Sequence, residues 1–413
     1  RMTKEFSTSP MFDNLGNWLI EQGIREASVE EVVQGFGRGL VDAGVSVNRV
    51  SLGGLLLHPV FGALDVVWNG KDDTINSQMM PRSVVTTEEF RNSPFFWAMS
   101  EHVPFRRFRL GEGAVTPDFP IFERLRSEGV TDYLLFFESY DRKLDPIWAD
   151  LPSGMEGVIL SVSTCRKGGF AGMEIAYLQA MMRPLTLNIK SSTTHELSRA
   201  LLDTYLGRYS GNRVLEGVVE RGDGGIIDCV LFYSDLRDST KLAENLPLDG
   251  YLSLINKYFD CSAGAVTDHG GEVLKFIGNA VIAIFPIDLQ NRPAVDMCRA
   301  AISAAREAFG RAAALSGQNP EDEGFSFGLS LHLGQVMYGN LGTERRLDFT
   351  VMGPAVNQVT RLEGLCKTMG VPTMMSEGFQ AQFNGNTAPL GQHTLPGLDH
   401  DIAVYTLPEF DTR

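Results

Sequence analysis

The chain has 413 residues, enough for two or three domains with their own cores at a usual size of about 150 residues each. Hydrophobic residues make up 43% and charged residues 21%, which is typical of a globular protein and excludes a largely disordered chain. The 36 Lys and Arg against 51 Asp and Glu give a net charge of −15, which argues against a nucleic-acid coat or a general binder of anionic membranes.

Three features predict a cytoplasmic protein without a membrane span. No run approaches the roughly 18 to 20 consecutive apolar residues of a transmembrane helix. The first residues, RMTKEFSTSPMFDN, contain no apolar signal core. The five cysteines are far apart and never form a C-x-x-C pair, so we expect reduced, buried thiols rather than disulfides or a zinc site: Cys165, Cys229, Cys261, Cys298 and Cys366.

A long helical stretch marks the boundary between two predicted domains. From residue 172 to residue 209 apolar side chains recur every three or four positions, and Pro184 is a candidate kink or division. Glycine-rich segments follow at 207–211 and 221–225. We therefore predict one domain over residues 1–190, a connecting helix and turn over 191–224, and a second domain over 225–413.

The first domain mixes helix and strand patterns. Residues 17–44 have helical apolar spacing, and strand candidates follow at 50–57, 64–68, 133–138 and 157–163, which predicts an α+β domain. The segment GVILSVSTCRKGGFAGMEIAYLQAMMRPLTLNI resembles the end of a GAF-type sensor domain, which implies an unidentified small ligand. His58, Trp68, His102 and Trp148 are candidates to line its pocket, and core or surface positions are the alternative.

The second domain has a clearer element order. Residues 226–234 form an apolar run that suits a strand buried on both faces, and 249–269 have helical spacing. Two apolar runs, 273–277 and 280–285, are joined by Gly278-Asn279, a strong signal for a two-residue hairpin. A helix over 293–315, strands at 325–333, 335–338 and 347–352, and a helix over 353–368 follow. This order predicts an α+β sandwich with one mixed sheet.

The end of the first strand carries candidate ligands for a cation and a phosphate. Asp235 lies where the chain leaves the core, which is a usual place for a hard-cation ligand. Asp238, Ser239 and Thr240 offer a helix N-cap, whose free N–H groups suit phosphate oxygens. The alternative is that Asp235 is an exposed strand-end residue.

Four further polar residues have positions that favour nucleotide recognition. Lys275 lies mid-strand between apolar neighbours, and Asn279 occupies the hairpin turn, where a metal-binding Asp would also fit. Asn357 and Arg361 are four residues apart, so they share one face of the predicted helix and suit a sugar and a phosphate. A solvated strand lysine, an ordinary turn asparagine and a solvated helix face are the alternatives.

Together these segments resemble the catalytic domain of class III adenylyl and guanylyl cyclases. The resemblance covers about residues 226–408 and is carried by FYSDLRDST, HGGEVLKFIGNAVIAIF and LSLHLGQVMYGNLGTERRLDFTVMGPAVNQVTRLEGLCK, in the family's order. Asp235 and position 279 are 44 residues apart (279 − 235), as are the family's two metal-binding acids. The resemblance implies a ferredoxin-like α+β fold for this domain, preceded by the GAF-like domain and the connecting helix.

The resemblance also implies a metal site with two departures from the family. Asp235 would bind two divalent ions, Mg²⁺ or Mn²⁺, with the Leu236 carbonyl and residue 279 as further ligands. The family's second metal-binding Asp is Asn279 here, which keeps a carbonyl oxygen but loses a negative charge. The family's phosphate-binding Lys corresponds to Pro396 in TLPGLD.

Roles for the remaining residues follow from the same resemblance. Lys275 and Thr350 would contact the purine, and this pair is similar to the bacterial, ATP-using branch. Asn357 would orient the ribose, and Arg361 would stabilise charge on the α-phosphate. Such sites form between two subunits, so one type of chain implies a head-to-tail homodimer with two equivalent sites.

We therefore expect a sensor-regulated adenylyl cyclase that converts ATP to 3′,5′-cyclic AMP and pyrophosphate by a two-metal mechanism. The main alternative is a catalytically inactive, nucleotide-binding pseudo-cyclase that signals by shape, and Asn279 is its chief support. A diguanylate cyclase is disfavoured because the sequence has no G-G-[DE]-E-F block.

Overall fold

The computed structural model describes residues 10–410 except 56–60, 112, 115, 141–154, 289, 317–323 and 398, with only the backbone described for residues 10–13. The chain divides into two compact units, Arg1–Leu201 and Leu202–Arg413, which we describe in turn. The division falls inside the predicted connector 191–224, and the limits of the predicted domains stay predictions.

An antiparallel sheet of six strands forms the centre of the first unit, in the spatial order β3-β2-β1-β6-β5-β4. The strands are β1 Arg49–Leu55, β2 Phe61–Asn69, β3 Thr74–Pro81, β4 Phe105–Arg109, β5 Asp132–Ser139 and β6 Gly157–Thr164. The four predicted strands correspond to β1, β2, β5 and β6, which contain most of the buried apolar residues of the sheet. The sequence pattern missed β3, whose side chains are mostly exposed, and β4, which contains three arginines.

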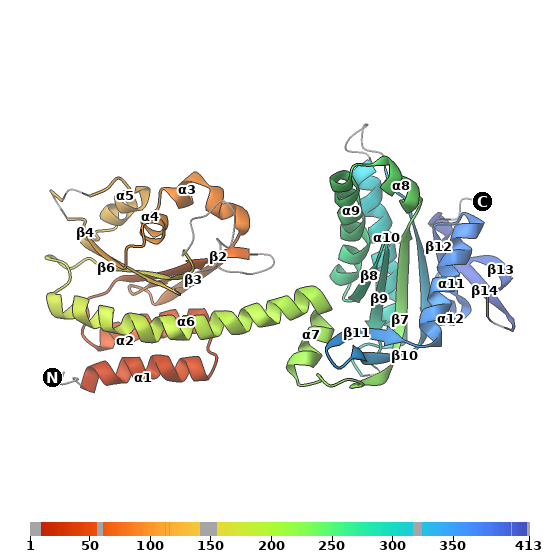
Figure 1. Cartoon of the computed structure of the whole chain (residues 1–413), viewed down its shortest axis with the longest axis horizontal. Coiled ribbons are helices and arrows are strands. Elements are labelled where there is room, and N and C mark those ends of the chain that lie inside the picture. Colours follow the sequence, from red (N-terminus) through yellow and green to blue (C-terminus); the bar gives the residue numbers. More distant parts are fainter. Residues whose placement is uncertain are drawn as a thin grey trace. The chain divides into compact units, whose positions relative to one another are not determined.

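Helices cover both faces of this sheet (Figure 1). One face is covered by α1 Pro10–Ile24, α2 Val29–Asp42 and α6 Gly172–Leu206, and the other by α3 Glu88–Arg91, α4 Pro94–Ser100 and α5 Pro120–Ser127. The helical pattern at 17–44 therefore belongs to two helices instead of one. α2 begins at a capping box, in which Ser28 and Glu31 exchange side-chain-to-backbone hydrogen bonds.

The long helix α6 runs through Pro184 without the predicted division. Leu178, Met181, Met182 and Leu185 around the proline are buried against the sheet, and this packing offsets the hydrogen bond that proline cannot donate. The helix ends before Gly207, whose φ of +87° lies in the left-handed region that favours glycine. α7 Arg208–Leu215 follows directly.

The second unit contains one mixed sheet, in the order β13-β14-β12-β10-β7-β9-β8, with β11 paired to β10. The strands are β7 Gly224–Leu236, β8 Glu272–Ile277, β9 Ala280–Pro286, β10 Phe327–Thr343, β11 Arg346–Met352, β12 Thr373–Ser376, β13 Ala388–Thr394 and β14 Asp401–Thr406. β10 and β12 run parallel, and the other pairs are antiparallel. The predicted break between two strands near residue 334 is absent, because β10 continues through Gly334 beneath Ala355.

The central strand β7 is buried on both faces from Cys229 onward, as predicted, but Ile226 at the start of the predicted run is 64% exposed. Val230 and Phe232 belong to a core shared with α9 Leu248–Asp268, α10 Ala294–Ser316 and α12 Glu377–Phe383. Cys229 and Leu231 belong to a core on the opposite face, which α11 Pro354–Met369 covers. Helices on both faces of the sheet confirm the predicted α+β sandwich, and the elements follow the predicted order apart from the undivided strand β10.

Two expectations about composition have mixed outcomes. Four of the cysteines are buried, but Cys165 is exposed, because it lies just beyond the end of β6. Within the described residues, none of the helices combines the length and the apolar character that a membrane crossing requires.

Candidate active site

The end of β7 and the β8–β9 hairpin bring three predicted metal ligands together. Asn279 Nδ2 donates to Asp235 Oδ1 at 2.5 Å and to the Leu236 carbonyl at 3.2 Å. The Leu236 amide in turn donates to the Asn279 carbonyl at 3.2 Å. Gly278, with φ of +61°, allows the tight turn that places Asn279 there. The structure thus confirms the predicted hairpin and the proximity of these residues.

These three residues offer oxygen donors that fit a hard dication, but with a reduced charge. The set contains one carboxylate, one backbone carbonyl and one amide, whose nitrogen faces the other two groups. Rotation of the Asn279 side-chain amide by half a turn would direct its oxygen, in place of its nitrogen, towards the other two groups. Among the described residues, no group of three or more His, Cys, Asp or Glu side chains lies together. Asp235 therefore supplies the negative charge at this point.

An ion pair that the sequence did not reveal fixes the end of β7 against α11. Arg237 Nη1 lies 2.5 Å from Glu363 Oε1, and Glu363 is only 5% exposed. A Cβ atom at Gly328 on the neighbouring strand would collide with the Arg237 guanidinium, so a larger residue there would displace it from this ion pair. Burial raises the pKa of Asp235, and the positive charges of Lys367 and Arg237 oppose that shift.

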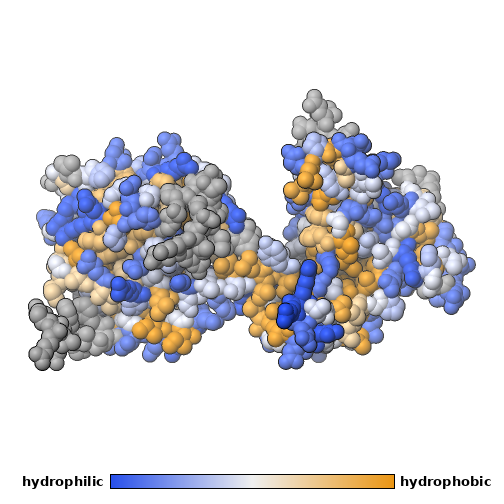
Figure 2. All heavy atoms as spheres, in the orientation of Figure 1, coloured by the Kyte–Doolittle hydropathy of each residue, from blue (hydrophilic) through white to orange (hydrophobic). Residues whose placement is uncertain are grey.

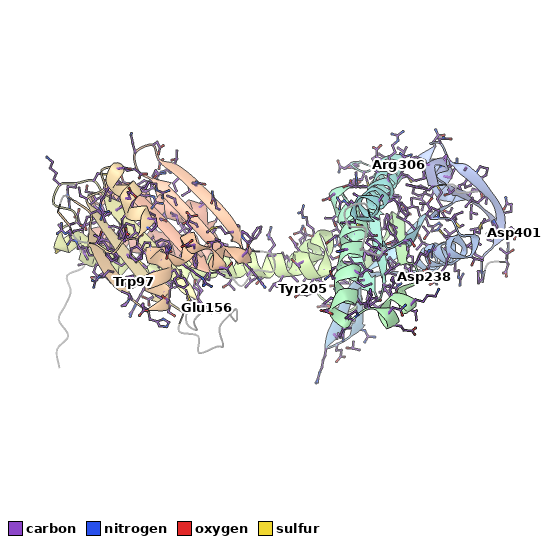
Figure 3. All side chains as sticks on the ribbon, turned by 90° about the horizontal axis from the view of Figure 1, so that it is seen from above. Trp97, Glu156, Tyr205, Asp238, Arg306 and Asp401 are labelled. Atoms are coloured by element: carbon purple, nitrogen blue, oxygen red, sulfur yellow. The ribbon has the colours of Figure 1, made fainter. Side chains whose placement is uncertain are left out.

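The turn after β7 departs from the predicted capping. α8 Ser239–Asn245 begins where expected, but Asp238 has a left-handed backbone (φ 52°) and its side chain makes no cap hydrogen bond. It lies 3.4 Å from Lys241 Nζ instead, in an exposed pair. Figure 3 labels Asp238 at this turn. A substrate-binding role for Asp238, Ser239 and Thr240 stays a prediction.

A second group of predicted residues lies on β8 and β11. Lys275 forms an ion pair with Asp348, and both side chains are about half exposed. Thr350 is two residues from Asp348 on the same face of β11, since Phe349 and Val351 are buried on the other face. Sequence reasoning missed Asp348, although its alternation with Thr350 was a usable signal.

The third group lies on α11. Gly353, with φ of +136°, and Pro354 open the helix as predicted, and Asn357 and Arg361 follow one turn apart. A Cβ atom at Gly397 would lie 3.0 Å from Arg361 Nη2, so the guanidinium lies against the turn that contains Pro396. Neither side chain has a hydrogen bond or an ion pair with another described residue. Both are therefore available to a ligand.

The predicted residues thus fall into three groups on one chain, the first two of which share the β8–β9 hairpin. No hydrogen bond or ion pair within the described part joins Asp235 or Asn279 to Lys275, Asn357 or Arg361. The first group offers ligands for a cation, the second offers polar contacts for a base, and the third offers an amide and a guanidinium.

For the two candidate pocket residues that the structure describes, Trp68 and His102, the alternative of a core or surface position is confirmed. Trp68 is 2% exposed and its ring nitrogen donates to Asp73 at 2.9 Å, so it belongs to the core on the α2 side of the sheet. His102 is exposed. His58 and Trp148 lie outside the described residues.

Comparisons with known proteins connect this chain to adenylate cyclases. No model of a protein family matches the sequence. The terminal-differentiation-specific adenylate cyclase of Dictyostelium discoideum is 34% identical over 151 residues, 35% of this chain and 7% of that protein. Adenylate cyclase 1 of Rhizobium meliloti (strain 1021) is 30% identical over 178 residues, 42% of this chain and 26% of that protein.

Solved structures include a bacterial light-regulated adenylyl cyclase that is 28% identical. It covers 45% of this chain and 92% of its own, with a TM-score of 0.39. The chain spans about a quarter or less of the length of the two curated relatives above. The sequence similarity supports a cyclase catalytic domain in this chain.

Proposed function

We propose that residues 225–413 form a class III adenylyl cyclase domain that converts ATP to 3′,5′-cyclic AMP and pyrophosphate. The observation that carries the proposal is the convergence of Asp235, the Leu236 carbonyl and Asn279 at the hairpin, across 44 residues of sequence (279 − 235). The similarity to curated adenylate cyclases supports it.

The reaction requires one bond to form and one to break at the α-phosphorus. The ribose 3′ oxygen bonds to the α-phosphorus and loses its proton to water, while the bond to the β-phosphate oxygen breaks and pyrophosphate leaves. Asn357 orients the ribose, and Arg361 stabilises the charge that develops on the α-phosphate. Asp235, the Leu236 carbonyl and Asn279 would hold two Mg²⁺ or Mn²⁺ ions, which would neutralise phosphate charge and lower the pKa of the 3′ hydroxyl.

Lys275 and Thr350 select adenine in this proposal. An ammonium donates to a ring nitrogen of adenine, and a hydroxyl contacts its amino group. The Lys275–Asp348 ion pair supports this role, because it holds the ammonium over the β11 face that also carries Thr350.

The complete site is proposed to form between two copies of the chain, as a head-to-tail homodimer. One copy supplies the metal group, and the other supplies Lys275, Thr350, Asn357 and Arg361. The separation of these groups on one chain supports this arrangement, as do exposed apolar side chains that flank Lys275 and Thr350, namely Phe276, Ile277, Leu347 and Met352. Figure 2 shows apolar surface on this unit.

We further propose how the enzyme is regulated and in which cellular compartment it acts. The first unit, which we propose to be a GAF-like sensor, biases the geometry of the dimer through the connector at 191–224. The protein acts in the cytoplasm.

One observation favours the pseudo-cyclase as a second candidate. The Asn279 amide donates to both Asp235 and the Leu236 carbonyl, and so occupies the two oxygens expected to bind a cation. A chain in that state would bind ATP without turnover.

A product assay tests the proposal. The full chain is incubated with ATP or GTP in Mg²⁺ and in Mn²⁺, and cyclic AMP and cyclic GMP are measured, with Arg361→Ala as the control. We expect cyclic AMP, more of it with Mn²⁺, and a loss in the variant. ATP binding without any cyclic nucleotide, even at high Mn²⁺, would instead establish the pseudo-cyclase.

A further inference from the structure

A cleft of about 590 Å³ lies within the first unit, between the sheet and helices α3, α4 and α5. Strands β1, β2, β3, β5 and β6 contribute its floor, and the two layers on either side of it are seen in Figure 1. Its volume falls in the range of roughly 300 to 1,000 Å³ of small-molecule sites. The cleft shares no residue with the three groups of the candidate active site.

The floor of this cleft carries polar and charged side chains among apolar ones, where a core would be apolar throughout. Strand β1 directs Val50 and Leu52 into the core beneath α2 and α6, and directs Arg49, Ser51 and Gly53 into the cleft. The same alternation puts hydroxyl and carboxyl groups of the neighbouring strands on the floor. Helices α3, α4 and α5 therefore cover a partly polar surface, and the cleft lies between these helices and the sheet.

Two charges on this floor form no ion pair, and each has the other as an oppositely charged neighbour whose attraction only partly offsets the loss of water. Arg49 and Asp65 are both only partly exposed, and neither forms an ion pair with a described residue. Asp65 has only the Ser51 hydroxyl, at 3.4 Å. Burial lowers the pKa of Arg49 and raises the pKa of Asp65, so both charged forms are disfavoured by loss of water.

The remaining charged residues of the cleft are satisfied in other ways. Arg124 and Glu128 on and after α5 lie 3.9 Å apart and are more than half exposed. Glu89 is exposed to water. Arg49 and Asp65 are thus the charges that a bound molecule would neutralise.

An unpaired charge taken out of water lowers stability, and proteins keep such charges where a ligand supplies the counter-charge. An anion alone would satisfy Arg49 and leave Asp65, while a cation alone would do the reverse. Tyr133 adds a hydroxyl on the same floor, and burial raises its pKa to about 12, so it stays protonated. The opposite wall, formed by the helices, contributes the apolar side chains of Phe90, Phe95, Met99 and Ile121.

We propose that this cleft binds a small amphoteric molecule whose carboxylate pairs with Arg49, whose ammonium group pairs with Asp65, and whose apolar remainder packs on the wall beneath α3 and α4. Free α-amino acids with apolar side chains have this chemistry, and they serve as the probes. The proposal concerns the first unit alone and does not depend on cyclase activity.

Calorimetric titration of the full chain with free L-phenylalanine, L-leucine and L-methionine is the first test. Two analogues each lack one charge: 3-phenylpropanoate and 2-phenylethylamine. We expect saturable binding of at least one amino acid and at least tenfold weaker binding of both analogues of phenylalanine. If the whole set of twenty L-amino acids shows no saturable binding, the proposal is overturned.

Matched variants test which charged group of the ligand pairs with Arg49 and which pairs with Asp65. Arg49→Met and Asp65→Asn should each weaken amino-acid binding at least tenfold, and the exposed controls Arg25→Met and Asp42→Asn should leave it unchanged. Asp65→Asn should not affect 3-phenylpropanoate, which has no ammonium group. Equal losses for both probes would refute the pairing with Asp65.

The ligand-free protein gives an independent readout. A double variant, Arg49→Met with Asp65→Asn, removes both unpaired charges and should unfold at a higher temperature than the wild type in scanning calorimetry. A purely structural role for these charges predicts a lower temperature. A lower unfolding temperature in a folded double variant would therefore overturn the proposal.

Discussion

At the residue scale, Asn279 decides how much negative charge the candidate metal site has. Its amide replaces a carboxylate and donates hydrogen bonds to Asp235 and to the Leu236 carbonyl. A carboxylate at this position could only accept, so it would leave both oxygens for a cation. At an effective dielectric near 20, one unit charge at 4 Å from another contributes about 4 kcal/mol before desolvation.

We predict that Asn279→Asp raises Mg²⁺-dependent cyclic AMP formation more than tenfold. The added charge strengthens cation binding, and Mn²⁺ should partly rescue the unchanged chain because it binds such donors more tightly. Initial rates against metal concentration measure the effect, and Asn212→Asp on the exposed face of α7 is the control. An Asn279→Asp variant that binds ATP but is no faster than the unchanged chain would favour the pseudo-cyclase.

Lys275 gives a second prediction at this scale, because Asp348 is its partner. Lys275→Glu should reduce ATP turnover at least tenfold and relax the preference for ATP over GTP. In this variant two negative charges would face each other and lower stability. The double variant Lys275→Glu with Asp348→Lys restores opposite charges, so it should recover stability without recovering selectivity. The ratio of kcat/KM for ATP and GTP measures this. A double variant that recovers the wild-type ratio would show that Lys275 does not select the base.

At the element scale, one buried carboxylate fixes α7 to β8 and β10. Glu272 Oε1 accepts from the Ser210 amide at 2.9 Å, the Ser210 hydroxyl at 2.5 Å and the Tyr338 hydroxyl at 3.1 Å. Glu272 Oε2 is buried and has no hydrogen-bond partner in the described structure. Burial raises the pKa of Glu272. The helix that follows α6 is thereby joined to the strand that carries Lys275.

The raised pKa predicts how stability depends on pH. The folded state holds the Glu272 proton more tightly than the unfolded state, whose pKa is about 4.3. Stability therefore falls as pH rises from that value through the raised pKa of the folded state. Glu272→Gln keeps an acceptor oxygen but cannot ionise, so its unfolding temperature should fall less between pH 5 and pH 8. Glu344→Gln, which is exposed, is the control, and parallel curves would contradict the prediction.

At the scale of the whole molecule, the three separate groups predict sites shared between two copies. Arg361→Ala should lower turnover by roughly 10² to 10³, about 3 to 4 kcal/mol, as for the loss of one transition-state donor. Asp235→Ala should cost at least as much. A mixture of the two variants should regain partial activity, because one of the two sites in a mixed dimer keeps both wild-type halves. A mixture that dimerises but stays inactive would exclude shared sites.

The sequence by itself determined the elements whose pattern is local. The apolar run that became β7, the Gly278-Asn279 hairpin and the helix opened by Gly353-Pro354 all formed as predicted, because burial, turn chemistry and fixed φ act over a few residues. β3 and β4 were missed because their polar side chains hide the strand period, and the strands depend on their neighbours for pairing.

Only the tertiary structure decided the contacts between distant segments. The sequence placed Asp235 and Asn279 in one site, but the amide hydrogen bonds between them depend on how the hairpin packs against β7. Asp348 and Glu363 acquired partners 73 and 126 residues away, and Arg49 and Asp65 lost water without forming an ion pair. Burial and pairing are properties of the assembled sheet and its helices, so no local pattern encodes them.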